Sequence, residues 1–263
     1  MALYIVPVPI GNLKDITLRA IDVLKSVDFI IAEDTRYSLK LLNSLGIKKR
    51  LYSYYKPKEE EKSESIVKHL KGKDGALITD SGTPLISDPG NILIRKVIEQ
   101  GIEIISLPGP TAFVPALTNS GLPSDNFLFI GFSPRKVGKL KTFLEQYKDL
   151  RFTMIFYESP RRVEKFLETA LKVFGDRMFS ISKELTKKNE KVIRGSLNDF
   201  PELLEDIKIL GEFVIVIDGN RDGDEENEPD LNTIDDIYDH FREKYGISRN
   251  RIKKILMTRK GDI

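Results

Sequence analysis

Short apolar runs alternate with helical patterns through residue 217 of the chain. Eight runs of four to six mostly apolar residues predict β-strands, at Leu3–Val8, Phe29–Ala32, Ala76–Thr79, Glu103–Leu107, Phe127–Gly131, Phe152–Tyr157, Met178–Ser182 and Phe213–Asp218. Strands that alternate with helices are typical of α/β proteins whose sheets are largely parallel. The pattern therefore predicts an α/β fold with largely parallel sheets.

Two of the intervening helices carry clear end signals. The first ends at Gly101, and one apolar face is predicted from Ile92, Leu93, Val97 and Ile98. The second begins at Ser159, a good N-cap residue followed by Pro160, and ends at Gly175. Its inward positions are predicted to be Val163, Phe166, Leu167, Ala170 and Leu171.

Composition narrows the classes of chemistry. A length of 263 residues corresponds to about two domains of roughly 150 residues each. Apolar residues make up 40% and charged residues 31%, a balance typical of folded globular proteins rather than disordered or fibrous ones. The absence of cysteine excludes disulfides, thiolate nucleophiles and cysteine-ligated metals. Because the only histidines are His69 and His240, neither a histidine metal centre nor a Ser-His-Asp triad is expected.

No targeting or membrane segment is expected. The apolar start Met1–Pro9 lacks a basic leader and soon reaches Gly11, so it predicts a buried strand rather than a signal peptide. The sequence contains no run of about 18 apolar residues, the length that a membrane-spanning helix needs. We therefore expect a cytoplasmic protein.

Two changes in composition suggest domain boundaries. The segment Pro115–Ser124 reads as a crossing between two α/β lobes, predicted at residues 1–116 and 117–220. Residues 221–230 are acidic and contain no apolar side chain, which predicts a solvated linker. Residues 231–263 then show helical spacing on both sides of Gly246, which predicts a helical hairpin.

The second helix of this hairpin is basic, and two interpretations of it stay open. Its cations are Arg249, Arg251, Lys253, Lys254, Arg259 and Lys260. A basic helix after a short turn resembles a helix-turn-helix, so the hairpin is a candidate RNA-binding element. A small helical pair with a merely solvated basic face fits equally well.

Three loops rich in glycine and proline follow predicted strands of the first lobe, at residues 9–12, 80–90 and 108–112. One such loop alone is typical of an ordinary turn. In α/β sheets, however, ligands bind outside the carboxyl ends of the strands, and glycine lets main chain approach a ligand closely. Three loops at that end indicate a pocket built from main-chain groups. No G-x-G-x-x-G motif follows a strand, so a Rossmann dinucleotide site is not supported.

These loops and five further motifs resemble the tetrapyrrole-methylase superfamily. The matching segments are residues 9–17, 33–36, 80–90, 108–112, 121–134, 156–162, 183–187 and 211–216. Read in order, they are most similar to the ribosomal branch of that superfamily, the small-subunit rRNA 2′-O-methyltransferase I enzymes, which modify a cytidine of the decoding centre. The resemblance covers residues 3–219, and the tail after residue 230 is only loosely similar.

The resemblance implies two α/β/α lobes of the class III methyltransferase type plus a small C-terminal helical segment. It also implies S-adenosyl-L-methionine held between the lobes, and a homodimer. The cofactor contacts carried over by motif are Pro9, Ile10, Gly11, Gly82, Thr83, Pro84, Ile86, Thr111, Ala112, Tyr157, Leu185, Gly211, Glu212 and Phe213. Plain core packing is the alternative for Ile10, Ile86 and Leu185.

Methyl transfer to a ribose 2′-oxygen is an in-line displacement, in which positioning and a base near the acceptor hydroxyl accelerate the reaction. The candidate bases on the matching motifs are Asp34, Asp88 and Glu184, with Lys183 as a further candidate if burial lowers its pKa. Asp34 and Asp88 equally suit a role as capping or loop-bracing carboxylates.

Clustered cations predict contacts with the substrate, which the resemblance implies is small-subunit rRNA or an assembled 30S particle. The candidate RNA-binding residues are Arg36, Arg135, Lys136, Arg161, Arg162, Lys183, Lys187, Lys188, Arg251, Lys253 and Lys254. For each of them a solvated surface position is the alternative.

Two rival functions remain. A corrin- or porphyrin-precursor methyltransferase of the same superfamily would use the same cofactor cleft. The second loop, however, contains Gly-Thr-Pro at residues 82–84, where the porphyrin enzymes typically have Gly-Asp-Pro. The other rival is a nucleic-acid-binding regulator whose α/β body only senses a ligand.

Overall fold

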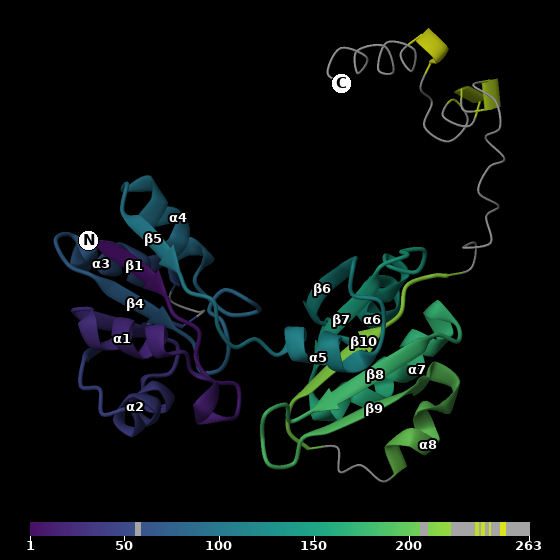
Figure 1. Ribbon diagram of the computed structural model, residues 1–263, viewed down its shortest axis with the longest axis horizontal. Coiled ribbons are helices and arrows are strands. Elements are labelled where there is room, and N and C mark those ends of the chain that lie inside the picture. The colour runs from purple at the N-terminus through teal and green to yellow at the C-terminus, as the bar shows by residue number, and fades with distance from the viewer. Residues whose placement is uncertain are drawn as a thin grey trace, which may run out of the picture. The chain divides into compact units, whose positions relative to one another are not determined.

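The computed structural model describes residues 1–55, 59–205, 210–221, 235–236, 238–239, 242 and 248–250 (Figure 1). Met1–Gly219 forms one compact unit, and Asn220–Ile263 forms a second. The first unit contains two five-stranded sheets with helices, so the predicted α/β class is confirmed. We call the two sheets with their helices the first lobe and the second lobe.

The first lobe is a parallel sheet with helices on both faces. Its strands follow the order β3-β2-β4-β1-β5, and every neighbouring pair is parallel. The strands are β1 (Ala2–Ile5), β2 (Phe29–Ala32), β3 (Arg50–Ser53), β4 (Gly75–Ile78) and β5 (Glu103–Ser106). The helices are α1 (Leu18–Ser26), α2 (Thr35–Ser44), α3 (Glu59–Leu70) and α4 (Asn91–Glu99).

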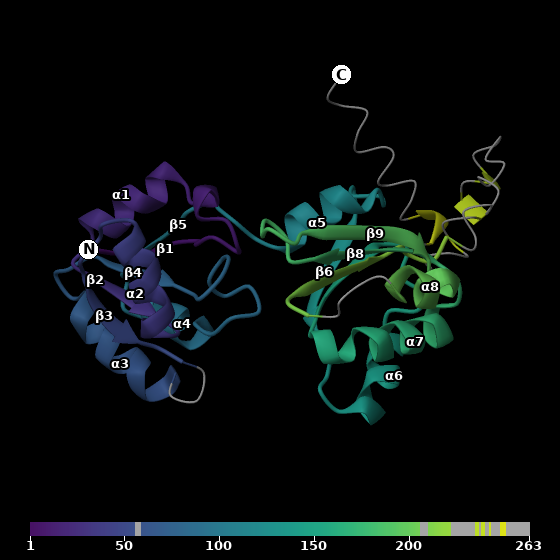
Figure 2. The same cartoon turned by 90° about the horizontal axis from the view of Figure 1, so that it is seen from below.

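Each face of this sheet has its own apolar core, because side chains of a strand alternate between faces. Leu3, Ile5 and Ile31 pack with the buried residues of α3 and α4. Val6 and Ile30 pack on the other face with the buried residues of α1 and α2. Figure 2 shows α1 on one side of the sheet and α3 and α4 on the other.

The second lobe has the strand order β6-β7-β10-β8-β9. Its strands are β6 (Phe127–Phe132), β7 (Thr153–Glu158), β8 (Met178–Lys183), β9 (Lys191–Ser196) and β10 (Phe213–Ile217). One face is covered by α6 (Val137–Glu145), α7 (Val163–Phe174) and α8 (Phe200–Glu205), and α5 (Phe113–Ser120) packs on the opposite face, against β8 and β10.

The prediction of largely parallel sheets is wrong for this lobe. Only β6 and β7 are parallel, whereas β10 is antiparallel to both β7 and β8, and β8 is antiparallel to β9. The short connection between β8 and β9 reverses the chain, since only a crossover of a dozen or more residues joins parallel neighbours. β10 then returns between β7 and β8 and runs opposite to both.

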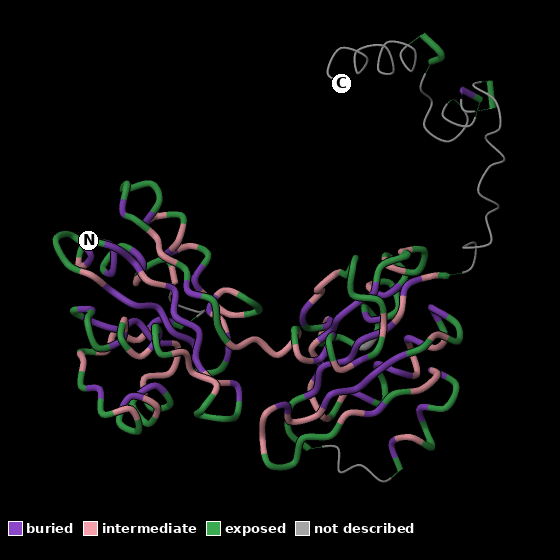
Figure 3. Tube along the Cα trace, in the orientation of Figure 1, coloured by how far each residue is buried: buried purple, intermediate pink, exposed green. Residues whose placement is uncertain are grey.

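Two of the observed strands, β3 and β9, were not predicted from the apolar runs, and both lie at sheet edges. β3 and β9 begin with exposed cations, Arg50 and Lys191, and are only partly buried (Figure 3). Edge strands are short and polar in many proteins, because charged side chains there discourage pairing with other chains. A search for apolar runs therefore finds the central strands and misses these two.

The predicted helix ends are close to the observed ones, with one error in the apolar face. Gly101 adopts a left-handed φ of 65° just after α4, as its stop signal predicts. The core side of α4 consists of Leu93 and Val97, whereas Ile98 is 62% exposed. Ile98 was therefore wrongly placed on the buried face.

The segment predicted as the crossing between lobes is partly helical. Pro115 to Ser120 belong to α5, whose Ala116 and Leu117 pack with Ile155 and Val214 of the second sheet. The expected division at residue 116 thus falls inside a helix of the second lobe. The hydrophobic face of α5 explains the placement, because it must be buried against a sheet.

Little of the C-terminal tail is described. The expected acidic linker, apart from Arg221, and the cations Arg251, Lys253 and Lys254 lie outside the described residues. Within the second unit, Arg249 lies over the ring of Tyr238 at 4.8 Å and pairs with Asp235. Residues from both predicted tail helices are therefore in contact.

A buried ion pair links β7 to the start of α7. Ser159 occupies the predicted N-cap position and Pro160 begins a 3₁₀ turn, but the Ser159 side chain makes no capping bond. Instead the buried carboxylate of Glu158 accepts bonds from the Ser159 N–H at 2.7 Å and from the Arg162 guanidinium at 2.6 Å. Arg162 also donates to the carbonyl of Ser133 on the neighbouring segment at 3.0 Å.

We expect Arg162→Met to lower the free energy of unfolding by about 3 kcal/mol, because it leaves the Glu158 carboxylate buried without its cation. Urea denaturation at neutral pH measures the effect. Arg161→Met is the matched control, since Arg161 is exposed and surface substitutions usually stay within about 0.5 kcal/mol. Equal stability of the two variants would contradict this role for Arg162.

Candidate functional site

The three glycine- and proline-rich loops meet at one edge of the first sheet. They follow β1, β4 and β5, which are neighbours in the parallel order β4-β1-β5, so their carboxyl ends lie together. Val8 and Gly82 exchange two main-chain hydrogen bonds, of 2.9 and 3.0 Å. The Thr83 hydroxyl donates to the carbonyl of Pro110 at 2.9 Å. The first loop is thus tied to the second, and the second to the third.

Glycine is needed at two contacts in this assembly. Gly82 has a φ of 84°, and a Cβ there would lie 3.4 Å from Ile10 Cγ2. A Cβ on Gly109 would lie 2.6 Å from the Cβ of Pro7, which is too close for any side chain. These glycines let the loops pack closely against one another.

Backbone strain is concentrated beside the same loops. In the described part of the chain, the non-glycine residues with positive φ are Leu85, Ser87, Glu184 and Thr186. The first two belong to the second loop, and the other two to the turn between β8 and β9. Such residues cost of order 1 kcal/mol each and cluster at functional sites, where the surrounding structure holds them in place.

A cavity of about 320 Å³, here called the main cavity, is lined by these loops and by the second lobe. Ten of the predicted cofactor residues line it, namely Ile10, Gly82, Thr83, Ile86, Thr111, Ala112, Tyr157, Gly211, Glu212 and Phe213. Asp88, predicted as a candidate base, lines it as well. The sequence did not point to seven further lining residues, namely Ser81, Ser87, Phe132, Glu158, Ser159, Pro160 and Val214.

The other four predicted cofactor residues lie next to the main cavity without lining it. Pro9 and Gly11 line a separate cavity beside α2. Leu185 is buried in the apolar cluster that also holds Ile10, so core packing accounts for its position. Pro84 is buried within the second loop.

Aromatic side chains form an apolar wall of the main cavity. The ring of Tyr157 makes edge-to-face contacts with Phe129 and Phe132, with ring centroids 5.0 and 5.5 Å apart. Burial raises the pKa of Tyr157 to about 12, so its hydroxyl stays neutral at physiological pH. Phe132 is 60% exposed, which leaves an aromatic face open to a ligand.

Asp88 is the candidate base that lines the main cavity. Burial raises its pKa to about 6, with further increases from the carboxylates of Glu33 and Asp80 and an opposing contribution from Thr79. Burial also raises the pKa of Glu33, whose carboxylate accepts a bond from the Thr79 hydroxyl at 3.0 Å. A carboxylate that titrates near neutral pH in a cavity wall suits proton transfer.

Sequence reasoning missed the acidic neighbours of Asp88. Asp80 lies two residues after the end of β4, and burial raises its pKa as well. Its carboxylate accepts a bond from the Asp34 N–H at 3.1 Å. The available signal was its position, because a carboxylate at the carboxyl end of a central strand faces the ligand side of the sheet.

Asp34 acts as a helix cap. Its carboxylate accepts a bond from the Arg36 N–H at 2.9 Å at the start of α2, and the Arg36 guanidinium pairs with it at 2.6 Å. The hydrogen bond from the Arg36 side chain lowers the pKa of Asp34 to about 2. Asp34 does not line the main cavity, and such an acidic group is a weak base. The capping interpretation therefore fits Asp34.

Glu184 forms a link between the β8–β9 turn and the start of β10. Its carboxylate accepts bonds from the Glu212 N–H at 3.0 Å and from Lys187 Nζ at 2.9 Å. Burial raises the pKa of Glu184, but these bonds and the positive charge of Lys187 outweigh it and bring the pKa below its usual value. Glu184 is thus engaged in an ion pair and does not line the main cavity.

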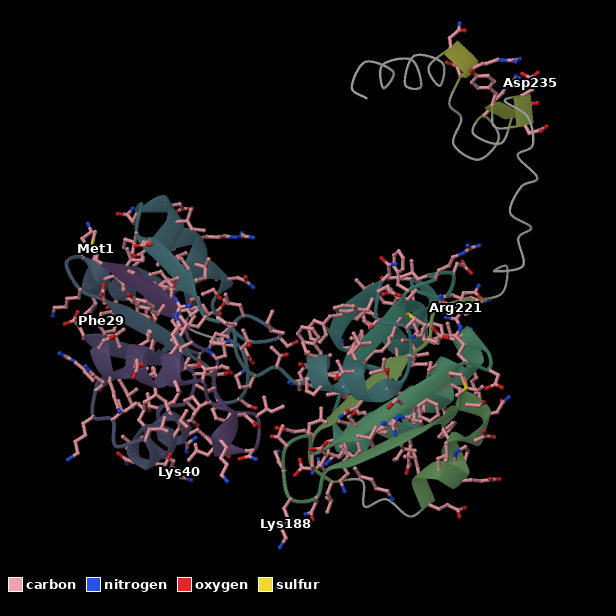
Figure 4. All side chains as sticks on the ribbon, viewed as in Figure 1. Met1, Phe29, Lys40, Lys188, Arg221 and Asp235 are labelled. Carbon is pink, nitrogen blue, oxygen red and sulfur yellow. The ribbon has the colours of Figure 1, made fainter. Side chains whose placement is uncertain are left out.

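The cations predicted to contact RNA fall into three groups. Arg36, Arg135, Lys136, Arg161 and Lys188 are exposed, although Arg36 is also paired with Asp34. Lys188 projects from the loop between β8 and β9 (Figure 4). Arg162 and Lys187 make ion pairs with glutamates, and Lys183 is half-buried. Arg251, Lys253 and Lys254 lie outside the described residues.

The described residues contain neither a metal-binding cluster nor a membrane-spanning helix. No group of three or more His, Cys, Asp or Glu side chains in this part of the chain is arranged to hold a metal ion. None of its helices combines the length and the apolarity that crossing a bilayer requires.

Known structures share this two-lobed fold. The methyltransferase CobJ superimposes with a TM-score of 0.61 at 18% identity, covering 84% of this chain and 94% of CobJ. Uroporphyrin-III-C-methyltransferase from Thermus thermophilus gives a TM-score of 0.58 at 19% identity and covers 82% of this chain and 93% of that protein. At these identities the likeness concerns the fold.

Sequence relatives and the family model identify the family. Ribosomal RNA small subunit methyltransferase I of Bacillus subtilis is 40% identical over 261 residues, covering 98% of this chain and 89% of that protein. The protein of the same name from Halalkalibacterium halodurans is 44% identical, covering 83% of this chain and 76% of its own length. The model of the Tetrapyrrole (Corrin/Porphyrin) Methylases matches residues 2–201. The chain belongs to this family and is a methyltransferase that uses S-adenosylmethionine as its methyl donor.

Proposed function

We propose that the protein methylates small-subunit rRNA at the ribose 2′-oxygen of a cytidine in the decoding centre. Relatives that are 40% and 44% identical over the aligned residues are named ribosomal RNA small subunit methyltransferase I, which supports rRNA as the substrate class. The observation that supports the chemistry is that the carboxylate of Asp88 lines the main cavity, where burial raises its pKa to about 6.

The main cavity fits S-adenosylmethionine. Its volume of about 320 Å³ lies within the range of small-molecule sites, roughly 300–1,000 Å³. Tyr157 and Ile86 offer apolar surface for an adenine ring, and the hydroxyls of Thr83 and Thr111 offer polar partners. Because Gly82 has no side chain, its main chain stays open to a ligand. When bound, the cofactor supplies an activated methyl group on a sulfonium.

The residues of the chain would position the acceptor and receive its proton. A ribose hydroxyl is a poor nucleophile, so a base beside it lowers the barrier to attack on the methyl carbon. The carboxylate of Asp88 would take up the hydroxyl proton as the methyl group moves from the sulfonium sulfur to the ribose oxygen, with the carbon–sulfur bond breaking and a neutral thioether leaving. The rigid loops hold the two reactants in line, which removes much of the entropic barrier.

Transfer of label from radioactive S-adenosylmethionine tests the proposed substrate. The full chain is incubated with small ribosomal subunits that lack the modification, with free rRNA and, separately, with uroporphyrinogen III. We expect label in RNA, resistant to alkaline cleavage at one position because a 2′-O-methyl group blocks attack on the adjacent phosphate. Affinity for the RNA should fall steeply with rising salt. Label in the tetrapyrrole alone would contradict the proposal.

We expect Asp88→Asn to lower kcat/KM by about 100-fold or more, the usual contribution of a positioned general base. The wild-type rate should rise with pH and level off above about 6, because only the ionised carboxylate accepts a proton. The variant should lose this dependence. An unchanged rate and pH profile in single-turnover assays would rule out Asp88 as the base.

Stability measurements serve as the control for this variant. The folded pKa of about 6 lies above the ordinary value of 3.8, so ionising Asp88 disfavours the folded state. The protonated carboxyl of Asp88 therefore stabilises the folded state fully below pH 3.8, and this stabilisation is lost as the pH rises through about 6. Asp88→Asn should thus be at least as stable as the wild type at pH 8, which separates lost catalysis from lost folding.

We expect Thr83→Val to weaken binding of S-adenosylmethionine about five- to tenfold, since it breaks the hydrogen bond from the Thr83 hydroxyl that ties the second loop to the third and such a bond contributes about 1 kcal/mol. Isothermal titration calorimetry measures the change. Thr83→Ser keeps the hydroxyl and should recover most of the affinity. An unchanged affinity in Thr83→Val would contradict this role for the hydrogen bond.

A further inference from the structure

A second cavity, here called the α2 cavity, lies beside the main cavity. Its volume is about 470 Å³, and it is formed mainly by the first loop, one face of α2 and the start of the second loop. Ile10, Ser81 and Glu212 line both cavities. A ligand in the α2 cavity would therefore lie next to one in the main cavity. The proposed cofactor site and the candidate base Asp88 belong to the main cavity, so the α2 cavity has no role in them.

Ser38 gives the α2 cavity an unsatisfied polar group. The residue lines the cavity and is only 2% exposed, and its Oγ has no hydrogen-bond partner. Buried hydroxyls are nearly always paired, because leaving one without a partner destabilises the fold. Although Ser38 lies within α2, its hydroxyl makes no bond to the preceding turn. An unpaired hydroxyl in a cavity wall indicates a polar ligand that forms the missing hydrogen bond.

An exposed aromatic ring lies next to this hydroxyl. Tyr37 lines the α2 cavity and is 61% exposed, unlike most aromatic side chains in the described part of the chain. Lys40 Nζ lies 5.5 Å from the centre of its ring, and Lys40 itself lines the cavity (Figure 4). A ring, a cation and a hydroxyl on one helix are the groups with which proteins bind unpaired nucleotides, through base stacking, phosphate contacts and hydrogen bonds.

We propose that the α2 cavity receives the target nucleoside of single-stranded RNA. This inference rests on the proposed function and adds the acceptor site to it. The base stacks on Tyr37, a polar atom of the nucleoside pairs with Ser38 Oγ, and Lys40 contacts a flanking phosphate. The carboxylate of Asp80, which also lines the cavity, accepts a bond from an exocyclic amine of the base, as carboxylates do with cytosine.

The position of the α2 cavity suits an enzyme that modifies one nucleotide of a folded RNA. Such enzymes take their target out of its stack and hold it in a pocket. The Tyr37 ring is accessible from solvent, whereas Ser38 is buried deeper, so a base entering from outside meets the ring first. The residues shared with the main cavity then bring the nucleoside beside the methyl donor.

Three variants of α2 test this inference in the full chain, with unmethylated small ribosomal subunits as the substrate. Tyr37→Ala should lower kcat/KM about tenfold, the effect of losing one base-stacking contact. Ser38→Ala should lower it about fivefold and raise the melting temperature by a few degrees, because an unpaired buried hydroxyl disappears. Leu39→Ala is the control, since Leu39 is 49% exposed on the same helix and does not line the cavity.

Calorimetry with S-adenosylmethionine separates the two cavities. Tyr37→Ala and Ser38→Ala should bind the cofactor as the wild type does, and Tyr37→Phe should recover most of the lost activity because it keeps the ring. If the wild type methylates RNA but Tyr37→Ala behaves like Leu39→Ala, the acceptor site is wrong and the proposed function stands. If the wild type transfers no label to any RNA, both proposals are overturned.

Discussion

The site depends on one main-chain interaction, the paired hydrogen bonds between Val8 and Gly82. They join the loops after two neighbouring strands and so fix where the first and second loops lie. The bond from Thr83 to Pro110 extends the same constraint to the third loop. Because the sheet is parallel here, all three loops emerge at its carboxyl edge, where each contributes residues to the lining of the main cavity. The position of this side of the cavity therefore depends on main-chain hydrogen bonds, whereas aromatic side chains of the second lobe form its apolar wall.

Electrostatics then separates carboxylates that look alike in the sequence. Asp34 and Glu184 each have a cation within hydrogen-bonding distance, and the pKa of each lies below its usual value. Asp88 is half-buried beside other carboxylates, so its pKa rises to about 6. The first two are thereby suited to holding structure, and the third to exchanging a proton. Environment rather than residue type assigns these different roles.

The sequence predicted most of what depends on local pattern. Apolar runs identify the central strands, and the position of the glycine- and proline-rich loops after those strands indicates the edge where the cavity lies. Features that arise only from tertiary contacts cannot be predicted from local sequence pattern. Arg162 looks like a surface cation, yet it pairs with a buried glutamate from the preceding strand. The antiparallel placement of β10 follows from the reversal between β8 and β9, and no property of its own five residues indicates it.

The features that suit the site to binding are also those that weaken the fold. Leu85 and Ser87 hold strained conformations, Asp88 is half-buried beside the carboxylates of Glu33 and Asp80, and Ser38 keeps an unpaired hydroxyl. Each is unfavourable in the free protein and would be relieved, or used, when a ligand binds. Their proximity to two adjoining cavities is difficult to explain by packing alone, since simple substitutions such as serine to alanine would remove the cost. Selection for a function that requires these groups explains why they persist.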